Sequence, residues 1–354
     1  MSVLTASQYA QINAKVRALK SKMLTVGDYE RLVQANNIDD VIRLLSTTPY
    51  GEKIAQVDLR PPFDLDSLDK ILNEDLIKSF DLLIGAASGA AKHYLKLYKE
   101  KFYFDNLKVV LNAVHNKIPK QKAMQYILSL SPEEDESLKT LLDSQNLYQV
   151  VDQVRNRKAK EALTAALPQF DNIKVPIVLE NALDAKIFGE LWRNISRLSQ
   201  SDRINIKPII GTKIDVINIL TIMRCKFLKL RPEIIDQLIL PVFYKAEQAI
   251  RESIGAQNLE AVLNILSLSD HRYLAYRARE AYEHEKSIFS IEHALNEYYI
   301  QIVYSTLIGF PFHIGVPISY LELKGQEIRN IKIIIVGKVE AVEPSKIRDL
   351  LIIF

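Results

Sequence analysis

The sequence predicts an all-α protein built from three copies of one helical unit of about 112 residues. Apolar residues recur at positions i, i+3, i+4 and i+7, which is the period of one face of an α-helix. Turn dipeptides of the kind that join β-strands are scarce. In addition, three short landmarks occur three times in the same order. A single such unit would leave apolar surface exposed, and packing three copies in sequence or around a common axis would bury it.

The first landmark is an amphipathic segment that begins with asparagine. It reads NIDDVIRLL at 37–45, NLYQVVDQV at 146–154 and NLEAVLNIL at 258–266. Asparagine is a preferred N-cap because its side-chain oxygen accepts a free backbone N–H of the first turn. We therefore expect helix caps at Asn37, Asn146 and Asn258. Asp40 and Gln149 stand at the capping-box position three residues on, and Ala261 breaks that pattern.

The other two landmarks follow in each copy. An acidic residue, two further residues, leucine and then asparagine or aspartate occur at 69–73, 180–184 and 292–296. An asparagine that opens a long apolar run occurs as NLKVVL at 106–111, NILTIM at 218–223 and NIKIII at 330–335. The last three asparagines are 112 and 112 residues apart, and Pro119 and Pro232 mark two borders. We therefore expect one domain with repeats 1–112, 113–225 and 226–354.

Each repeat is expected to hold the short amphipathic helix, a long helix and an apolar helix. The long segments 66–102, 176–200 and 285–309 show no strand-like alternation. The run 330–339 is β-branched, but its place as the third copy of a helical landmark favours a helix. GAASGAA at 85–91 is expected to give one helix a small-residue face on which another helix packs closely.

The stretch 298–321 needs a separate interpretation, because it contains no Asp, Glu, Lys or Arg over a length that could span a bilayer. The segment GFPFHIGVP would break a helix in its middle. We therefore expect a buried helix end followed by a tight loop. The protein itself is not expected to cross a membrane.

Composition restricts the compartment and the class of partner. The 354 residues include 46 Lys plus Arg and 43 Asp plus Glu, so the formal net charge is +3. A near-neutral balance does not indicate a nucleic-acid binder. Cys225 has no second cysteine to pair with, which suits a reducing compartment. The N-terminal twenty residues lack the apolar core of a secretory signal, so we expect an intracellular protein.

Motifs that carry chemistry are absent from the sequence. It has no phosphate-binding loop, no His pair with zinc-ligand spacing and no GxSxG nucleophile elbow. We therefore predict no catalytic residue, no cofactor and no metal site, although an enzyme with a dispersed site stays open. Segment 92–103 interleaves lysines with aromatic residues. That pattern serves single-stranded nucleic acid in some proteins; an exposed lysine stripe with inward aromatic rings is the favoured interpretation.

Three segments resemble a known family. YAQINAKVRALKSKMLTVGDYERLV at 9–33 resembles the opening of the C subunit of archaeal and bacterial A/V-type rotary ATPases, whose eukaryotic counterpart is the d subunit of the vacuolar proton pump. NIDDVIRLLSTTPYG at 37–51 continues the resemblance. EIRNIKIIIVGKVEAV at 327–342 is similar to the family's final helix. The motif residues of the first segment are Tyr9, Asn13, Arg17, Lys20, Ser21, Asp28 and Tyr29.

The resemblance implies an all-α, funnel-shaped fold of three tandem three-helix units around a pseudo-threefold axis. It implies a non-catalytic central-stalk adaptor, peripheral on the cytoplasmic face of the membrane. Such an adaptor seats the axle subunits D and F on the rotor ring of proteolipid subunits, and couples ATP hydrolysis or synthesis to proton or sodium-ion transport.

Five basic residues are candidate partner contacts, and solvated surface charge is an equally good explanation for each. They are Arg17, Lys20, Lys22, Arg329 and Lys332. The alternative function is a helical-repeat nucleic-acid-binding or scaffold protein.

Overall fold

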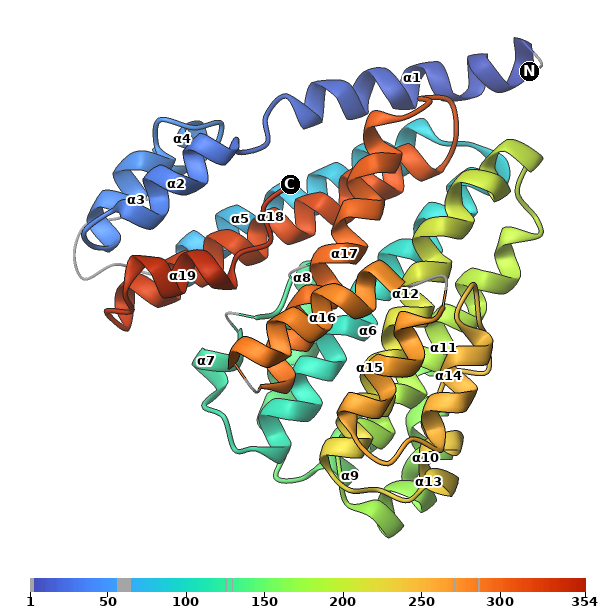
Figure 1. Cartoon of the computed structure of the whole chain (residues 1–354). Coiled ribbons are helices and arrows are strands. Elements are labelled where there is room, and N and C mark those ends of the chain that lie inside the picture. Colours follow the sequence, from blue (N-terminus) through green and yellow to red (C-terminus); the bar gives the residue numbers. More distant parts are fainter. Residues whose placement is uncertain (1–2, 56–64, 125, 129, 270–271, 286) are drawn as a thin grey trace. The chain divides into compact units, whose positions relative to one another are not determined.

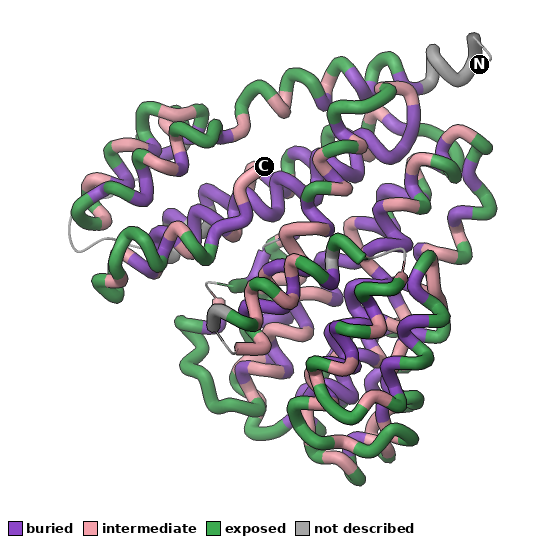
Figure 2. Tube along the Cα trace, viewed as in Figure 1, coloured by how far each residue is buried: buried purple, intermediate pink, exposed green. Residues whose placement is uncertain are grey.

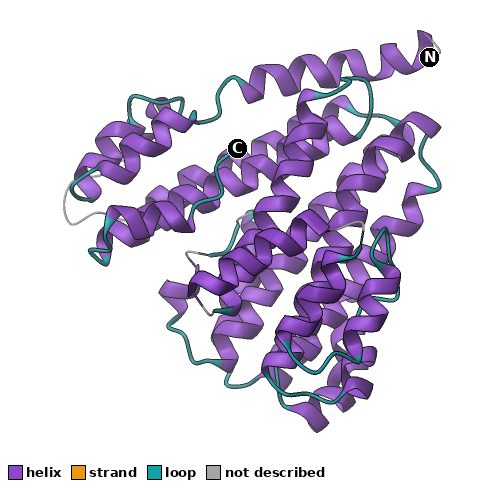
Figure 3. Cartoon of the chain, viewed as in Figure 1, coloured by secondary structure: helices purple, strands orange, loops and turns teal. Residues whose placement is uncertain are grey.

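The computed structural model describes residues 3–55, 65–124, 126–128, 130–269, 272–285 and 287–354. Within these ranges the regular elements are helices and no strand is present (Figure 3), so the all-α prediction is confirmed. The chain divides into two compact units. Unit 1 comprises Met1–Ala113, Lys117–Asp143 and Tyr304–Phe354, and unit 2 comprises Val114–Asn116 and Ser144–Val303. The three-repeat domain organisation stays a prediction.

Unit 1 combines the first and the last parts of the chain (Figure 1). Its helices are α1 (Val3–Lys20), α2 (Val26–Gln34), α3 (Ile38–Leu45), α4 (Gly51–Ile54), α5 (Leu65–Ala86), α6 (Gly89–His115), α7 (Lys120–Met124), α8 (Pro132–Leu142), α18 (Gly315–Val339) and α19 (Pro344–Leu350). The core of this unit follows α18, which is buried along most of its length (Figure 2). Helices α1, α3, α5 and α19 pack on it.

Unit 2 holds the middle of the chain. Its helices are α9 (Leu147–Gln153), α10 (Arg157–Ile173), α11 (Ile177–Ile195), α12 (Gln200–Phe227), α13 (Pro232–Leu238), α14 (Glu247–Ile254), α15 (Leu259–Ser267), α16 (Arg272–Glu285) and most of α17 (Ile288–Ile308). Helix α11 packs on α10 and α12, and α15 packs on α14 and α16. Helix α12 is largely buried and has the same role in this unit as α18 has in unit 1.

The three predicted asparagine caps are confirmed. Asn37, Asn146 and Asn258 are extended, and each side-chain oxygen accepts the N–H of the residue three positions on, which starts α3, α9 and α15. The side chains of Asp40 and Gln149 accept from the backbone N–H of Asn36 and Gln145, one residue before the cap. These two pairs therefore differ from a standard capping box, which would bond the cap residue itself.

Three helices end in the same way, 112 residues apart. Lys117, Lys229 and Ala341 follow α6, α12 and α18 with φ of 54°, 57° and 53°. The next residue donates its N–H to a carbonyl five positions back in each case, from Ile118 to Ala113, from Leu230 to Cys225 and from Val342 to Gly337. A left-handed residue with such a bond satisfies carbonyls that a helix end leaves free. The sequence repeat is therefore also a repeat of local structure.

One sequence expectation is wrong and another is confirmed only in part. GAASGAA does not form a small-residue helix face: α5 ends at Ala86 and α6 begins at Gly89, whose φ is 53°. A side chain at Gly85 or Gly89 would meet no neighbour, so no helix packs closely on these glycines, and Gly89 with its positive φ marks the turn between α5 and α6. The uncharged stretch 298–321 does contain the expected helix end, since α17 stops at Ile308 and α18 starts at Gly315, but this end is exposed and not buried: Ile308 is 58% exposed. Among the described helices, none is both long and apolar enough to cross a bilayer.

Candidate functional site

Three buried asparagines form one repeated contact, here named the asparagine clamp. Asn106, Asn218 and Asn330 are at most 3% exposed. Each side chain donates to the carbonyl of the residue 22 positions on and accepts that residue's N–H. The donor–acceptor distances are 2.7 and 2.9 Å to Leu128, 3.3 and 2.7 Å to Leu240, and 2.8 and 3.2 Å to Ile352. The clamp therefore fixes a non-helical segment against the apolar helix at each of the three positions.

A buried carboxylate lies one turn before two of the clamps. Asp215 on α12 accepts the backbone N–H groups of Tyr244, Lys245 and Ala246 at 3.0, 2.8 and 3.2 Å. Its counterpart 112 residues later, Glu327 on α18, accepts the N–H of Leu24 at 2.6 Å. Both acceptors hold the chain just before an opening helix, which is α14 in unit 2 and α2 in unit 1. Glu327 on α18 therefore holds the start of α2, as Asp215 on α12 holds the start of α14.

Glu327 also belongs to a buried charge cluster. Lys324 lies 2.7 Å from Glu327 and 2.9 Å from Asp75, and the Tyr50 hydroxyl donates to Glu327 at 2.7 Å. Burial alone lowers the pKa of Lys324, but the carboxylate of Glu327 outweighs it and the pKa is raised. Burial together with the Glu327 charge raises the pKa of Tyr50 well above its usual value. Every charge has a close partner, which favours a structural role over proton transfer.

A second buried pair joins α6 to α18. Lys101 lies 3.0 Å from Glu322, and the Tyr98 hydroxyl donates to the same carboxylate at 2.6 Å. Asp105 lies 3.2 Å from Lys101. Burial raises the pKa of Asp105, but the charges of Lys101 and Lys108 outweigh it and hold the pKa well below its usual range. The polar residues that line α18 are thus paired with residues of α5 and α6.

Two copies of the acidic landmark meet at one arginine. On α12, Arg224 lies 2.6 Å from Glu292 and 3.8 Å from Glu180. Burial lowers the pKa of Arg224, but the negative charges of Glu292 and, to a smaller extent, Glu180 outweigh burial and raise the pKa above its usual value. The side chain of Asp69, the first copy, lies outside the described residues. The acidic landmark residues therefore join α11 and α17 to α12 through ion pairs within unit 2. The sequence pattern did not reveal this role.

The predicted contact residues occupy different environments. Arg17 and Lys22 are exposed, and Lys20 is half-buried with its amine 5.6 Å from the centre of the Tyr304 ring. Arg329 is half-buried, and its charge contributes to the low pKa of Asp105. Lys332 is 7% exposed and donates to the Ile127 carbonyl at 2.9 Å. Three of the five residues therefore lie at the end of α1 and two lie on α18. That any of the five contacts a partner stays a prediction.

Segment 92–103 has the expected inward aromatic rings, but its lysines do not form a fully exposed stripe, since Lys92 and Lys99 are half-buried and Lys101 is buried. Tyr94, Tyr98, Phe102 and Tyr103 are buried, with exposed fractions of 4% or less. Lys96 is exposed. The rings that would stack on nucleobases therefore pack in the protein core instead.

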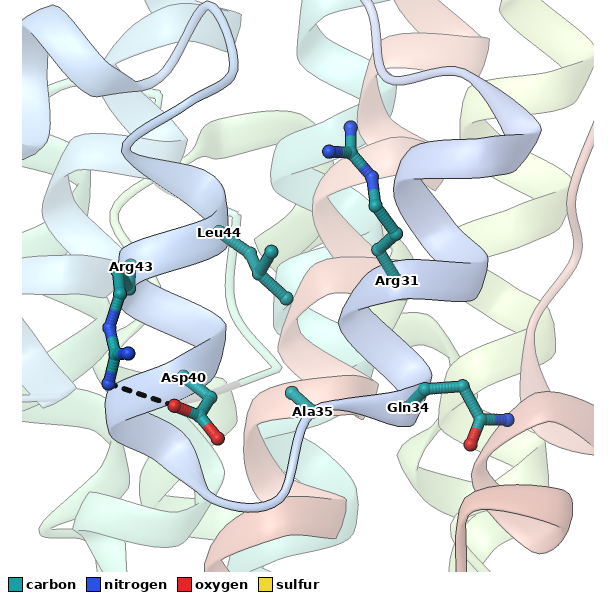
Figure 4. A pocket seen from close by; sticks show the side chains of 6 residues that line it. All are labelled: Arg31, Gln34, Ala35, Asp40, Arg43 and Leu44. Atoms are coloured by element: carbon teal, nitrogen blue, oxygen red, sulfur yellow. Dashed lines mark ion pairs between the residues drawn. The ribbon is translucent and has the colours of Figure 1, made fainter.

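A shallow pocket of about 320 Å³ lies between α2 and α3 (Figure 4). Its floor is Ala35 and Leu44, and its rim carries Arg31, Gln34, Asp40 and Arg43. Asp40 and Arg43 are paired at 2.9 Å, so the carboxylate is held by its neighbour. In the part of the chain that the structure describes, no three His, Cys, Asp or Glu side chains gather as metal ligands.

Comparison with known proteins matches nearly the whole chain. The family model for the ATP synthase (C/AC39) subunit matches residues 12–350. The C subunit of the A-type ATP synthase from Methanocaldococcus jannaschii is 26% identical over 99% of this chain and 88% of its own length. The proteins of the same name from Pyrococcus abyssi and Methanococcoides burtonii are 21% and 23% identical over 97% and 99% of this chain, and 90% and 95% of their own lengths. The chain therefore belongs to the ATP synthase (C/AC39) subunit family.

Proposed function

We propose that this chain is the non-catalytic central-stalk adaptor of an A/V-type rotary ATPase. It seats the axle subunits D and F on the membrane rotor ring, and so couples ATP hydrolysis or synthesis to ion transport. The family match over residues 12–350 carries the proposal. The relatives are named as subunits of an A-type ATP synthase.

The repeated local contacts support a closed arrangement of three related units around a pseudo-threefold axis. In unit 2, α13 packs on α14 and α12 on α15. In unit 1, α19 packs on α2 and α18 packs on α3. Helices α18 and α19 correspond to α12 and α13 one repeat later, and α2 and α3 correspond to α14 and α15. The end of the third repeat thus meets the start of the first, as the second meets the third. In our proposal three units closed in this way form a funnel that receives an axle tip and resists torque.

A framework whose buried charges on α18 are paired suits an adaptor better than an enzyme. Its charged side chains on α18 bind neighbouring helices rather than converging on a cleft. In our proposal the chain lies on the cytoplasmic face and is peripheral. Arg17, Lys20 and Lys22 at the end of α1, and Arg329 and Lys332 on α18, are the first residues to test as contacts with the ring or the axle.

A binding experiment tests this function. The tagged full chain is mixed with detergent-solubilised rotor ring, or with the D–F axle pair, and bound subunits are quantified. Arg17→Glu is the test variant and Arg157→Glu is the matched control, since Arg157 is 90% exposed on α10. We expect both partners to be retained by the wild-type chain. Retention of neither partner would refute the adaptor role.

A further inference from the structure

One end of unit 1, here named the end surface, consists of residues 82–91 and 308–312. The directions of α5, α6 and α18 place the two segments at one end of the unit. Helix α5 runs antiparallel to α18, since Ser79 meets Tyr320 and Asp75 meets Lys324. Helix α6 runs parallel to α18, since its Tyr98 meets Glu322 and its Phe102 lies against Gly325. The end of α5, the start of α6 and the start of α18 therefore lie at the same end of the unit (Figure 1).

The end surface exposes apolar side chains and carries no charge. Ile308 is 58% exposed, Phe310 is 50% exposed and Leu82 is 39% exposed. Neither 82–91 nor 308–312 contains Asp, Glu, Lys or Arg. The bordering carboxylate of Asp81 is paired with Lys99 at 3.3 Å. Exposed apolar patches of this kind mark interaction sites in soluble proteins.

The aromatic tip is held in place by its neighbours. The ring of Phe310 contacts Phe312 edge-on at 5.7 Å and stacks on His313 at 6.3 Å. His313 is 1% exposed and anchors the tip to the body of the unit. The corresponding turn of repeat two, between α11 and α12, is SRLS at 196–199, with Arg197 exposed. An apolar tip is therefore not required for this kind of helix connection.

Basic side chains stand at a defined depth behind the end surface. Lys92 and Lys96 follow Gly89 along α6 by one and two turns, which is about 5 and about 10 Å. Lys96 is exposed and Lys92 is half-buried. Cations at this depth would reach the headgroup layer if the tip entered the acyl boundary of a bilayer.

We propose that the end surface inserts into the interfacial layer of a lipid bilayer, with Ile308 and Phe310 as the inserted side chains. A protein partner would require roughly one hydrogen bond per 100–200 Å² of interface. The end surface is dominated by Leu, Ile, Ala, Gly and Phe, which supply few polar side chains for that purpose. An aromatic and aliphatic tip backed by lysines suits the boundary between acyl chains and headgroups. This inference goes beyond the adaptor role and does not depend on it.

Vesicle binding by the full chain, without any other subunit, tests the inference. The chain is floated with phosphatidylcholine vesicles, with and without phosphatidylserine. The double variant Ile308→Asn/Phe310→Ser should weaken binding about tenfold or more, because two apolar anchors are lost. Lys96→Gln should weaken binding to the anionic vesicles alone, by about fivefold. Val339→Ser, at the opposite end of α18 and 52% exposed, is the matched control and should bind as the wild type does.

A fluorescence experiment tests whether a lipid bilayer or a second copy of the chain covers the end surface. With brominated lipid, Phe310→Trp should be quenched beyond the background of Trp192, and Val339→Trp should not be. Absence of vesicle binding, or equal quenching of both variants, would overturn the inference. So would a dimer in sedimentation that Phe310→Ser abolishes, since a second copy would then cover the surface. The circular dichroism spectrum of each variant confirms that it is folded. Because these experiments contain no ring or axle subunit, their outcome does not affect the adaptor proposal, which the binding experiment with those subunits tests.

Discussion

Replacing a clamp asparagine by alanine should destabilise the protein by about 2–5 kcal/mol. Asn218→Ala removes both hydrogen bonds to Leu240 and leaves a buried N–H and a buried carbonyl without that partner. Each buried polar group left unsatisfied costs about 1–3 kcal/mol, and the small cavity adds to this. Asn218 is fully buried, so water cannot replace the lost bonds without a rearrangement.

Urea unfolding followed by circular dichroism measures this cost. Asn106→Ala and Asn330→Ala should lose stability in the same range, because their two bonds to Leu128 and Ile352 have the same geometry. Asn205→Ala is the control: it lies on α12 like Asn218, but bonds only to the Ser201 carbonyl within its own helix. We expect a change of about 0.5 kcal/mol or less for the control. Equal losses for Asn218→Ala and Asn205→Ala would refute the reasoning.

Three further predictions concern charge and backbone conformation. Glu327→Ala should cost about 3–5 kcal/mol in urea unfolding, whereas Lys324→Met/Glu327→Leu should cost less, because the double variant removes both fully buried charges and leaves only the half-buried Asp75 without Lys324. The pKa of Asp105 is depressed in the folded chain, so its contribution to stability is present above the unfolded pKa of about 4 and is lost as the pH falls through the folded pKa. Asp105→Asn should therefore reduce stability at neutral pH and flatten the decline of stability as the pH falls below about 4; an unchanged slope in that range would contradict this. Lys229→Gly should raise the unfolding free energy by about 1 kcal/mol, since φ at Lys229 is 57°, and a decrease in the melting temperature would count against it.

Much of the local architecture could be predicted from sequence because repetition fixed the register. The caps at Asn37, Asn146 and Asn258 and the helix across 330–339 are confirmed. The three clamp asparagines were recognised as landmarks, but their role was not. Their partners are main-chain atoms of residues 22 positions on, and the side chains there carry no distinguishing chemistry.

The charged interior of α18 could not be predicted from composition or spacing. Solvated surface charge is one expectation from the sequence for Lys332, yet Lys332 and Glu327 are both buried. Their partners, Leu24 and Ile127, are 303 and 205 residues away in sequence. GAASGAA was misjudged for a related reason. Small residues suit a packing face and a tight turn equally well, and only the positive φ of Gly89 decides between them.

Native mass spectrometry of a reconstituted assembly tests the central-stalk role most directly. The chain is combined with the membrane rotor ring and with subunits D and F, and the mass of the intact complex is measured. The proposed function predicts a single complex that contains one copy of this chain, one ring and the axle pair, and from which the axle is absent when this chain is omitted. A ring and an axle that join equally well without this chain would contradict it.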